Sequence, residues 1–452
     1  MQKKYHLIAI GGSVMHNVAI DLQELGHDIT GSDDEIYEPS RSRLADRGLL
    51  PDKTGWDEGR ITSDIDAIIL GKHAKSDNPE LQRALQLNIP IYSFPEFISM
   101  NSKAEKRVCI AGSHGKTSTT SMIMHVLKYH DLEFDYLVGA QLEGFDKMVK
   151  ISDADILICE GDEYPSSVLD DRAKMLHYKA TISVITGMAW DHVNIYTTYD
   201  SYKQAFRDFL NTMPPEAVCF FDQSDDELNR MLQNESFPSA RRSYRALFLN
   251  KRSEVELNGS KYPVKVFGRH NMLNMNAALL VCQELGINEE AFFEAIESFK
   301  GAAKRLELIH ESDGLLIYRD FAHAPSKCKA TVEAVRSRYP DKKITAILEL
   351  HTFSSLDIRF IKEYAGSMDL ADRAYVYFDK HALQMKGMPE LDTNEVFKAF
   401  DNQTLKVINA PDELEVSIRK SMHDNTDILL LMSSGNVGGL QLDQIFKSEQ
   451  AN

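Results

Sequence analysis

Short apolar runs that end in glycine recur along the chain and alternate with helical patterns. Tyr5–Ile10 leads into Gly11, and Val108–Ala111 leads into Gly112. Each run has the length and composition of a buried strand. Apolar residues at helical spacing then follow, as in Val14–Leu25. Strands that alternate with helices predict an α/β fold with parallel sheets.

The length of the chain predicts more than one domain. At roughly 100 to 200 residues per domain, 452 residues suggest three. We expect a Rossmann-like domain over 1–105, a central P-loop-type domain over 106–299 and a second Rossmann-like domain over 300–452. The first domain lacks the Gly-x-Gly-x-x-Gly fingerprint, so a dinucleotide-binding oxidoreductase is an alternative with little support.

The second glycine loop has the composition of a phosphate cradle. Gly112 and Gly115 have no Cβ, so backbone N–H groups can turn toward an anion, and the start of the following helix adds unpaired donors. Lys116 would reach the terminal phosphates and Thr117 would hold Mg²⁺. Ile110 stands where the general P-loop pattern has a glycine, so only a shorter version is present. We expect contacts with a nucleoside triphosphate from Gly112, Ser113, His114, Gly115, Lys116, Thr117 and Ser118.

An acidic segment follows the apolar run Asp155–Cys159. Glu160, Asp162 and Glu163 place three carboxylates within four residues, which is costly unless a cation neutralises them. Mg²⁺ prefers oxygen ligands and takes one or two carboxylates together with substrate phosphates. Glu160 is nearest the strand and is the predicted ligand, whereas a solvated acidic loop is the alternative.

Composition and charge narrow the class of protein. A net charge of −17 argues against non-specific nucleic-acid binding. No apolar run approaches the roughly 20 residues that a membrane span needs, so we expect a cytoplasmic protein without membrane insertion. Five scattered cysteines without a Cys-x-x-Cys pair predict neither disulfides nor a zinc site.

The segment Ala111–Thr117 resembles the ATP loop of the Mur ligases, the ATP-dependent amide-forming enzymes of peptidoglycan synthesis. Further segments resemble the same family in the same order along the chain, and the last of them is a glycine turn at the C-terminal end. They are Gly31–Pro39, Asp171–Tyr178, Gly187–His192, Gly268–Asn274, Phe299–Arg305, Arg319–Ser326 and Ser433–Gly439. The resemblance implies that UDP-N-acetylmuramate is joined to an amine through an acyl phosphate.

The resemblance also implies roles for residues that match the family's motifs. It gives Gly12, Ser13, Ser32, Asp33 and His73 to the UDP-sugar site, with Arg172 and His323 as further substrate-binding candidates. It gives His270, Asn271 and Asn274 to adenine, Arg305 and Asp320 to the nucleotide, and His192 to a second Mg²⁺. Lys116, His192 and Arg305 form the predicted catalytic set.

Each of these roles has a structural alternative. The UDP-sugar residues could be ordinary turn residues, His192 a plain loop residue, and Asn271 only a helix cap. Ala189 replaces a glutamate that relatives usually carry, which puts the second metal in question, and Lys304 replaces a frequent arginine.

The amine and the oligomeric state are left open by the sequence. Gly31–Pro39 and Asp171–Tyr178 resemble the murein peptide ligase branch, which uses the tripeptide L-alanyl-γ-D-glutamyl-meso-diaminopimelate. The sister branch uses L-alanine alone. A P-loop switch that binds nucleotide to signal is an alternative of another class. In the ligase reading, the third domain would close on the linker near Arg305 and exclude water from the acyl phosphate.

Overall fold

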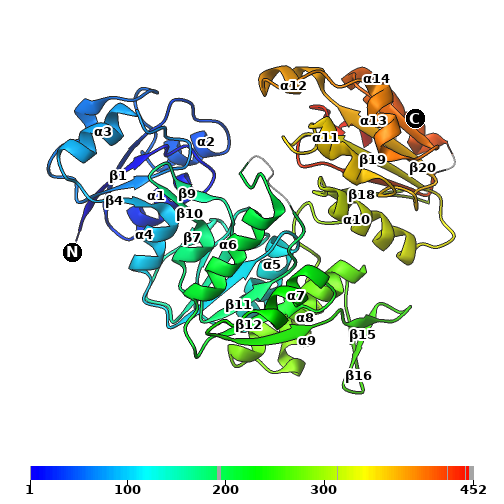
Figure 1. The fold of residues 1–452 in the computed structure, drawn as a ribbon, viewed down its shortest axis with the longest axis horizontal. Coiled ribbons are helices and arrows are strands. Elements are labelled where there is room, and N and C mark those ends of the chain that lie inside the picture. The colour runs from blue at the N-terminus through cyan, green and yellow to red at the C-terminus, as the bar shows by residue number, and fades with distance from the viewer. Residues whose placement is uncertain (1, 191–194, 313, 425, 443, 447–452) are drawn as a thin grey trace. The chain divides into compact units, whose positions relative to one another are not determined.

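A computed structural model describes residues 2–190, 195–312, 314–424, 426–442 and 444–446 (Figure 1). The chain divides into two compact units. The first comprises 1–188, 200–245 and 276–296, and the second comprises 189–199, 246–275 and 297–452. Each unit is described separately below.

The first unit begins with a parallel four-stranded sheet in the order β2-β1-β3-β4. The chain places β2 on one side of β1 and β3 on the other, so the strand order reverses between β1 and β3. In open α/β sheets, ligands bind outside the carboxyl ends of the strands at such a reversal. The elements are β1 (Lys4–Ile8), α1 (Met15–Glu24), β2 (Asp28–Ser32), α2 (Ser40–Asp46), β3 (Ala67–Leu70), α3 (Pro79–Gln86), β4 (Ile91–Ser93) and α4 (Phe94–Asn101).

The same unit contains a seven-stranded sheet in the order β13-β12-β11-β5-β8-β6-β7, in which only β7 runs antiparallel to its neighbour. Its strands are β5 (Lys106–Ala111), β6 (Asp135–Leu137), β7 (Val149–Lys150), β8 (Ile156–Gly161), β11 (Ile182–Ile185), β12 (Val218–Asp222) and β13 (Ala240–Tyr244). The short antiparallel pair is β9 (Pro165–Ser167) with β10 (Asp170–Ala173), and the helices are α5 (Lys116–Tyr129), α6 (Tyr199–Thr212), α7 (Asp226–Asn234) and α9 (Glu289–Ile296).

The second unit is built on a six-stranded sheet in the order β17-β18-β22-β19-β20-β21, parallel except for β17. Its strands are β17 (Glu307–Ser312), β18 (Leu315–Asp320), β19 (Ile344–Leu350), β20 (Arg373–Phe378), β21 (Leu405–Ile408) and β22 (Ile428–Met432). Its helices are α10 (Pro325–Arg338), α11 (Ile358–Ile361), α12 (Lys380–Met385), α13 (Thr393–Phe400) and α14 (Pro411–His423). The antiparallel strands β14 (Phe248–Leu249), β15 (Glu254–Leu257) and β16 (Ser260–Pro263) also belong here.

The buried positions explain why these elements form. β3 and β19 are buried along their whole length, as expected for parallel strands with both faces covered. In the second unit, α10 and α13 cover one face of the sheet with Cys328, Val335 and Phe400. The other face packs against α14 through Leu414 and Ile418.

The predicted α/β class is confirmed, and some predicted boundaries move. Helix α8 (Arg269–Glu284) contains most of the Gly268–Asn274 segment, and it crosses the division between the two units. Strand β8 continues through Glu160 to Gly161, so the predicted metal ligand lies in the strand. All five cysteines are free and buried. Among the described residues, no helix is both long and apolar enough to cross a membrane.

Candidate nucleotide and substrate sites

Three parallel strands of the seven-stranded sheet end next to one another. β5 pairs with β8 on one side and with β11 on the other. The chain leaves β5 to build β6 and β8 and only then returns to build β11, so the strand order reverses beside β5. The carboxyl ends of parallel strands at such a point are where open α/β sheets bind ligands. The predicted phosphate loop therefore lies at the place that the topology favours.

The loop after β5 has a backbone that requires glycine. Gly112 has φ +116°, and a Cβ there would lie 2.6 Å from Thr186 Oγ1. Gly115 has φ +80° and directly precedes helix α5. The Ser113 N–H donates to the Gly187 carbonyl at 3.0 Å, and the Thr186 hydroxyl donates to the carbonyls of Ala111 and His114. The segment after β11 thus fixes the loop from one side.

Lys116 lies at the centre of a buried polar cluster. Its Nζ donates to the Gly112 carbonyl at 2.5 Å and to Glu163 Oε2 at 3.1 Å. The Tyr202 hydroxyl donates to the other oxygen of Glu163 at 2.9 Å, and both of these side chains are fully buried. Burial would lower the pKa of Lys116, but Glu163 and Asp162 outweigh it and raise the pKa above its usual value. The lysine is therefore held as a cation inside the loop.

Two of the predicted magnesium ligands lie together. The Thr117 hydroxyl donates to Glu160 Oε2 at 3.4 Å. A hydroxyl beside a carboxylate is an oxygen-only donor set of the kind that Mg²⁺ prefers, so these residues fit the ion. The third predicted ligand, His192, lies outside the described residues. Among the described residues, no group of three histidines, cysteines or carboxylates could hold a metal ion.

An aspartate that sequence analysis did not select fixes the segment after β11. The Met188 N–H donates to Asp225 Oδ2 at 2.6 Å, and the other oxygen of Asp225 caps α7 by accepting from the Leu228 N–H. The signal that could have found it is an aspartate directly before a helical pattern, the usual N-cap position. Asp225 contributes to the site only by holding backbone.

The first glycine loop lies at the reversal between β1 and β3. The Gly11 N–H donates to Asp33 Oδ2 at 2.8 Å, and burial together with Asp34 raises the pKa of Asp33 to about 6. Gly12 donates its N–H to the Ala9 carbonyl, and Ser13 contacts Met148 Sδ at 3.4 Å. Three of the UDP-sugar candidates, Gly12, Ser13 and Asp33, thus lie in or next to the same glycine loop.

Ser32 is placed differently from the other UDP-sugar candidates. Its side chain is fully buried and donates to Glu80, which also lies 3.4 Å from His6. The Ser32 hydroxyl could contact a ligand directly only if it gave up its hydrogen bond to Glu80. His73, in contrast, is exposed on the loop after β3. It lines an open hollow of about 530 Å³ with Lys72, Ala74, Lys75, Ser76, Asp77, Pro165, Ser167 and Val168.

Arg172 forms an ion pair with a neighbouring carboxylate. Its guanidinium donates to both oxygens of Asp170, at 2.9 and 2.8 Å, and Asp170 also lies 3.1 Å from His177 Nε2. Burial lowers the pKa of His177. Two residues of the Asp171–Tyr178 segment, Arg172 and His177, therefore share the Asp170 carboxylate in a local charged cluster on β10 and the turn that follows.

In the second unit, Asp320 anchors the segment that the sequence identified as a linker. Its carboxylate accepts from the N–H groups of Leu306 at 2.6 Å and Ala322 at 2.7 Å, and from the Thr331 hydroxyl. The Arg305 guanidinium lies 4.8 Å from the centre of the Phe321 ring. Asp320 thus fixes the backbone that carries Arg305.

The predicted adenine residues lie in the first turns of α8. Burial lowers the pKa of His270, and its Nδ1 has no hydrogen-bond partner among the residues that the structure describes. The Asn271 amide donates to the Phe267 carbonyl at 2.8 Å, and Asn274 is buried. His323 Nδ1 lies 2.9 Å from the Phe321 carbonyl. The buried, unpartnered nitrogen of His270 is suited to a hydrogen bond from a ligand.

The C-terminal glycine turn is filled by a carboxylate of the chain itself. Glu349 accepts from the N–H groups of Val437 at 3.0 Å and Gly438 at 2.9 Å, and from the Ser433 hydroxyl. Glu349 itself is almost completely buried at the end of β19. The glycine turn expected here from the sequence therefore binds an anionic group of the chain itself, the Glu349 carboxylate.

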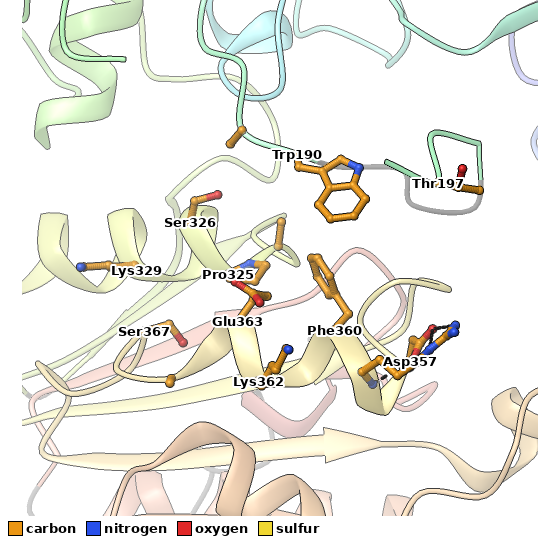
Figure 2. Close-up of a pocket in the computed structure, with 14 residues that line it drawn as sticks. Trp190, Thr197, Pro325, Ser326, Lys329, Asp357, Phe360, Lys362, Glu363 and Ser367 are labelled. Atoms are coloured by element: carbon orange, nitrogen blue, oxygen red, sulfur yellow. Dashed lines mark hydrogen bonds and ion pairs between the residues drawn. The ribbon is translucent and has the colours of Figure 1, made fainter. Parts of the chain in front are cut away.

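The second unit also contains a hollow of about 800 Å³ (Figure 2). Figure 2 shows the Phe360 ring directed toward Trp190, with Glu363 and Pro325 beside it. Residues of both charges line the hollow, and Asp357 and Arg359 pair with each other. The full lining is Ala189, Trp190, Thr197, Ala324, Pro325, Ser326, Lys329, Asp357, Arg359, Phe360, Lys362, Glu363, Ala365 and Ser367.

Three family models match consecutive parts of the chain. The model described as "Mur ligase family, catalytic domain" matches residues 4–106. "Mur ligase middle domain" matches 110–282, and "Mur ligase, glutamate ligase domain" matches 304–435.

Several similar curated proteins are UDP-N-acetylmuramate–L-alanine ligases. The UDP-N-acetylmuramate–L-alanine ligase of Paenarthrobacter aurescens is 31% identical over 82% of this chain and 82% of its own. The enzyme of that name from Caldicellulosiruptor bescii is 30% identical over 87% of each chain. That of Aquifex aeolicus is 27% identical over 96% of this chain and 95% of its own.

Solved structures share the fold. A murein peptide ligase from Psychrobacter arcticus superposes with a TM-score of 0.67 at 20% identity, covering 99% of this chain and 98% of its own. The UDP-N-acetylmuramate-alanine ligase of Thermotoga maritima gives 0.70 at 20% identity, covering 99% and 100%. A second ligase from that organism, solved in complex with ADP, gives 0.59 at 15% identity, covering 99% and 94%.

Proposed function

This chain belongs to the Mur ligase family, and from that premise we propose that it joins the carboxylate of UDP-N-acetylmuramate to the amino group of an L-alanine residue. Mur ligases are ATP-dependent ligases that form amide bonds in peptidoglycan synthesis. The observation that carries the proposal is the convergence of Lys116, Thr117 and Glu160 at the ends of β5 and β8. We assign the UDP-sugar to residues 1–105 and ATP to 106–299, in a cytoplasmic enzyme.

The chemistry needs positive charge because the first step brings two anions together. An oxygen of the substrate carboxylate attacks the γ-phosphorus of ATP, and the bond to ADP breaks. The amine nitrogen then attacks the acyl carbon, phosphate leaves with the bonding pair, and the nitrogen loses a proton. Lys116 and the N–H groups of the 112–117 loop would stabilise the charge on the transferring phosphoryl group. Mg²⁺, held by Thr117 and Glu160, would supply further charge neutralisation.

The curated relatives' names favour free L-alanine as the amine, and we adopt it as the first candidate. The sequence prediction favoured the tripeptide instead, and it stays a prediction. Its support is the local resemblance of Asp171–Tyr178 to murein peptide ligases, together with the 800 Å³ hollow of the second unit. That hollow is far larger than one alanine needs, and its mixed charges suit a peptide.

The test is phosphate release with each component omitted in turn. The proposal expects release only when ATP, Mg²⁺, UDP-N-acetylmuramate and an amine are all present. L-alanine and L-alanyl-γ-D-glutamyl-meso-diaminopimelate are supplied in parallel at matched concentrations, and the ratio of kcat/KM values names the amine. Release without UDP-sugar and amine would instead support a nucleotide switch, and turnover of a nicotinamide cofactor would support the oxidoreductase.

A further inference from the structure

The loop after β3 brings cationic side chains to the strand reversal of the first sheet. Lys72, His73 and Lys75 are exposed on this loop. A Cβ at Gly71 would lie 2.9 Å from Ala9 Cβ, so the loop begins directly against the end of β1. Lys72 is therefore next to the glycine loop where this sheet is expected to bind its ligand.

Lys72 also contacts the acidic segment that follows β8. Its Nζ lies 3.6 Å from the centre of the Tyr164 ring, which is close for a cation over an aromatic face. Tyr164 follows Glu163, the partner of Lys116. One lysine thus connects the loop after β3 to the segment beside the phosphate loop.

The charges around Lys72 do not balance. The nearby Lys174 is paired with Asp162 at 2.6 Å. Lys72 forms no ion pair with any carboxylate among the residues that the structure describes. Although part of the Lys72 side chain stays in contact with solvent, desolvation by its neighbours and the nearby Lys174 lower the pKa of Lys72 to about 8. Two ammonium groups therefore share one carboxylate, an arrangement that a bound anion would stabilise.

Space for that anion lies beside the ammonium group. Lys72 lines the open hollow of about 530 Å³, together with Ser167 from β9 and with His73, Lys75 and one carboxylate, Asp77, from the loop after β3. Tyr164 supports the ammonium on one side, and the hollow adjoins Lys72.

We propose that Lys72 is a specificity-determining residue that binds an anionic group of the UDP-sugar, and that the Tyr164 ring is a positioning residue for its ammonium. This inference rests on the proposed function. The anion is either the diphosphate or the lactyl carboxylate of UDP-N-acetylmuramate, since both offer the charged oxygens that an ammonium binds.

The test separates recognition of the UDP-sugar from the rest of the reaction. Lys72→Gln is expected to raise the KM for UDP-N-acetylmuramate about tenfold, the loss of one charge-assisted hydrogen bond. KM for ATP and kcat at saturation should stay within twofold. Lys72→Arg should recover part of the affinity. Tyr164→Leu should raise the same KM by less, whereas Tyr164→Phe, which keeps the ring, should not.

Lys103→Gln is the matched control, because this lysine is exposed and paired with Asp153 on the surface. Calorimetric binding then identifies the anion. Equal weakening of UDP-N-acetylglucosamine and UDP-N-acetylmuramate by Lys72→Gln would assign the diphosphate, and weakening of the latter alone would assign the carboxylate. Unchanged binding of both sugars, or an equal effect of Lys103→Gln, would overturn the proposal. A wild-type protein that binds the UDP-sugar but releases no phosphate would contradict the proposed function. The calorimetric comparison of wild type and Lys72→Gln would still test the role of Lys72 in binding.

Discussion

The loops after β5 and β22 start from the same sequence pattern and end in different states. Each follows a buried strand and contains glycines with positive φ, Gly112 and Gly115 in the first and Gly438 and Gly439 in the second. Among the described residues, the N–H groups of Gly115, Lys116 and Thr117 have no acceptor. In the second loop, Glu349 accepts two N–H groups and a hydroxyl.

The difference shows that a glycine loop provides an anion site only when no carboxylate of the chain reaches it. Backbone N–H groups in such loops bind oxygens regardless of their source. In the first sheet the outcome is intermediate, because Asp33 accepts one N–H group of the glycine loop, that of Gly11, and a second N–H from its neighbour Asp34. The carboxylates near the phosphate loop contact Lys116 and Thr117 through their side chains and leave the backbone donors accessible.

The largest expected effect is at Lys116. Lys116→Ala should lower kcat for phosphate release by about 10²- to 10³-fold, because one preorganised charge is lost from the proposed phosphoryl-transfer site. Circular dichroism should show a folded protein. Lys106→Ala, an exposed lysine at the start of β5, is the control and should stay within twofold. Near-normal turnover by a folded Lys116→Ala variant would refute this placement of ATP.

Removing the carboxylate from the C-terminal loop tests the comparison directly. Glu349→Ala should lower the free energy of unfolding by about 2 to 4 kcal/mol, because three donors, two of them buried, lose their charged acceptor. Urea denaturation measures this loss, and Glu349→Gln, which keeps one acceptor oxygen, should lose less.

Inorganic phosphate should then restore part of the lost stability. A ligand that binds the folded state alone raises stability with its concentration. We therefore expect millimolar phosphate to raise the melting temperature of Glu349→Ala more than that of the wild type or of Glu349→Gln. Identical shifts in the three proteins would show that the emptied loop is not an anion cradle.

The smallest effect is expected in the first glycine loop. The pKa of Asp33 is raised in the folded state to about 6, so the folded protein binds more protons than the unfolded chain between about pH 4 and 6. Stability is therefore lost as the pH rises through that window. Asp33→Asn should be more stable than the wild type by about 1 to 2 kcal/mol at pH 8, because the neutral amide carries no buried charge. The gain should vanish near pH 4, and a gain that is equal at both pH values would exclude this cause.

Local pattern predicted the parts of the site that lie close together in sequence. The strand before Gly112, the glycines, Lys116 and Thr117 occupy ten residues, so periodicity and residue type identify them without tertiary information.

Contacts between distant segments could not be predicted in this way. Glu349 lies 84 residues before Ser433, and Tyr202 lies 39 residues after Glu163, so no local spacing connects them. The sequence by itself determined the α/β class, the glycine loops and the residue types that can bind phosphate and Mg²⁺, because backbone geometry and side-chain chemistry are local properties. Only the tertiary structure decided which of those loops is left accessible to a ligand, because that depends on which carboxylate the packing of remote strands brings to each loop.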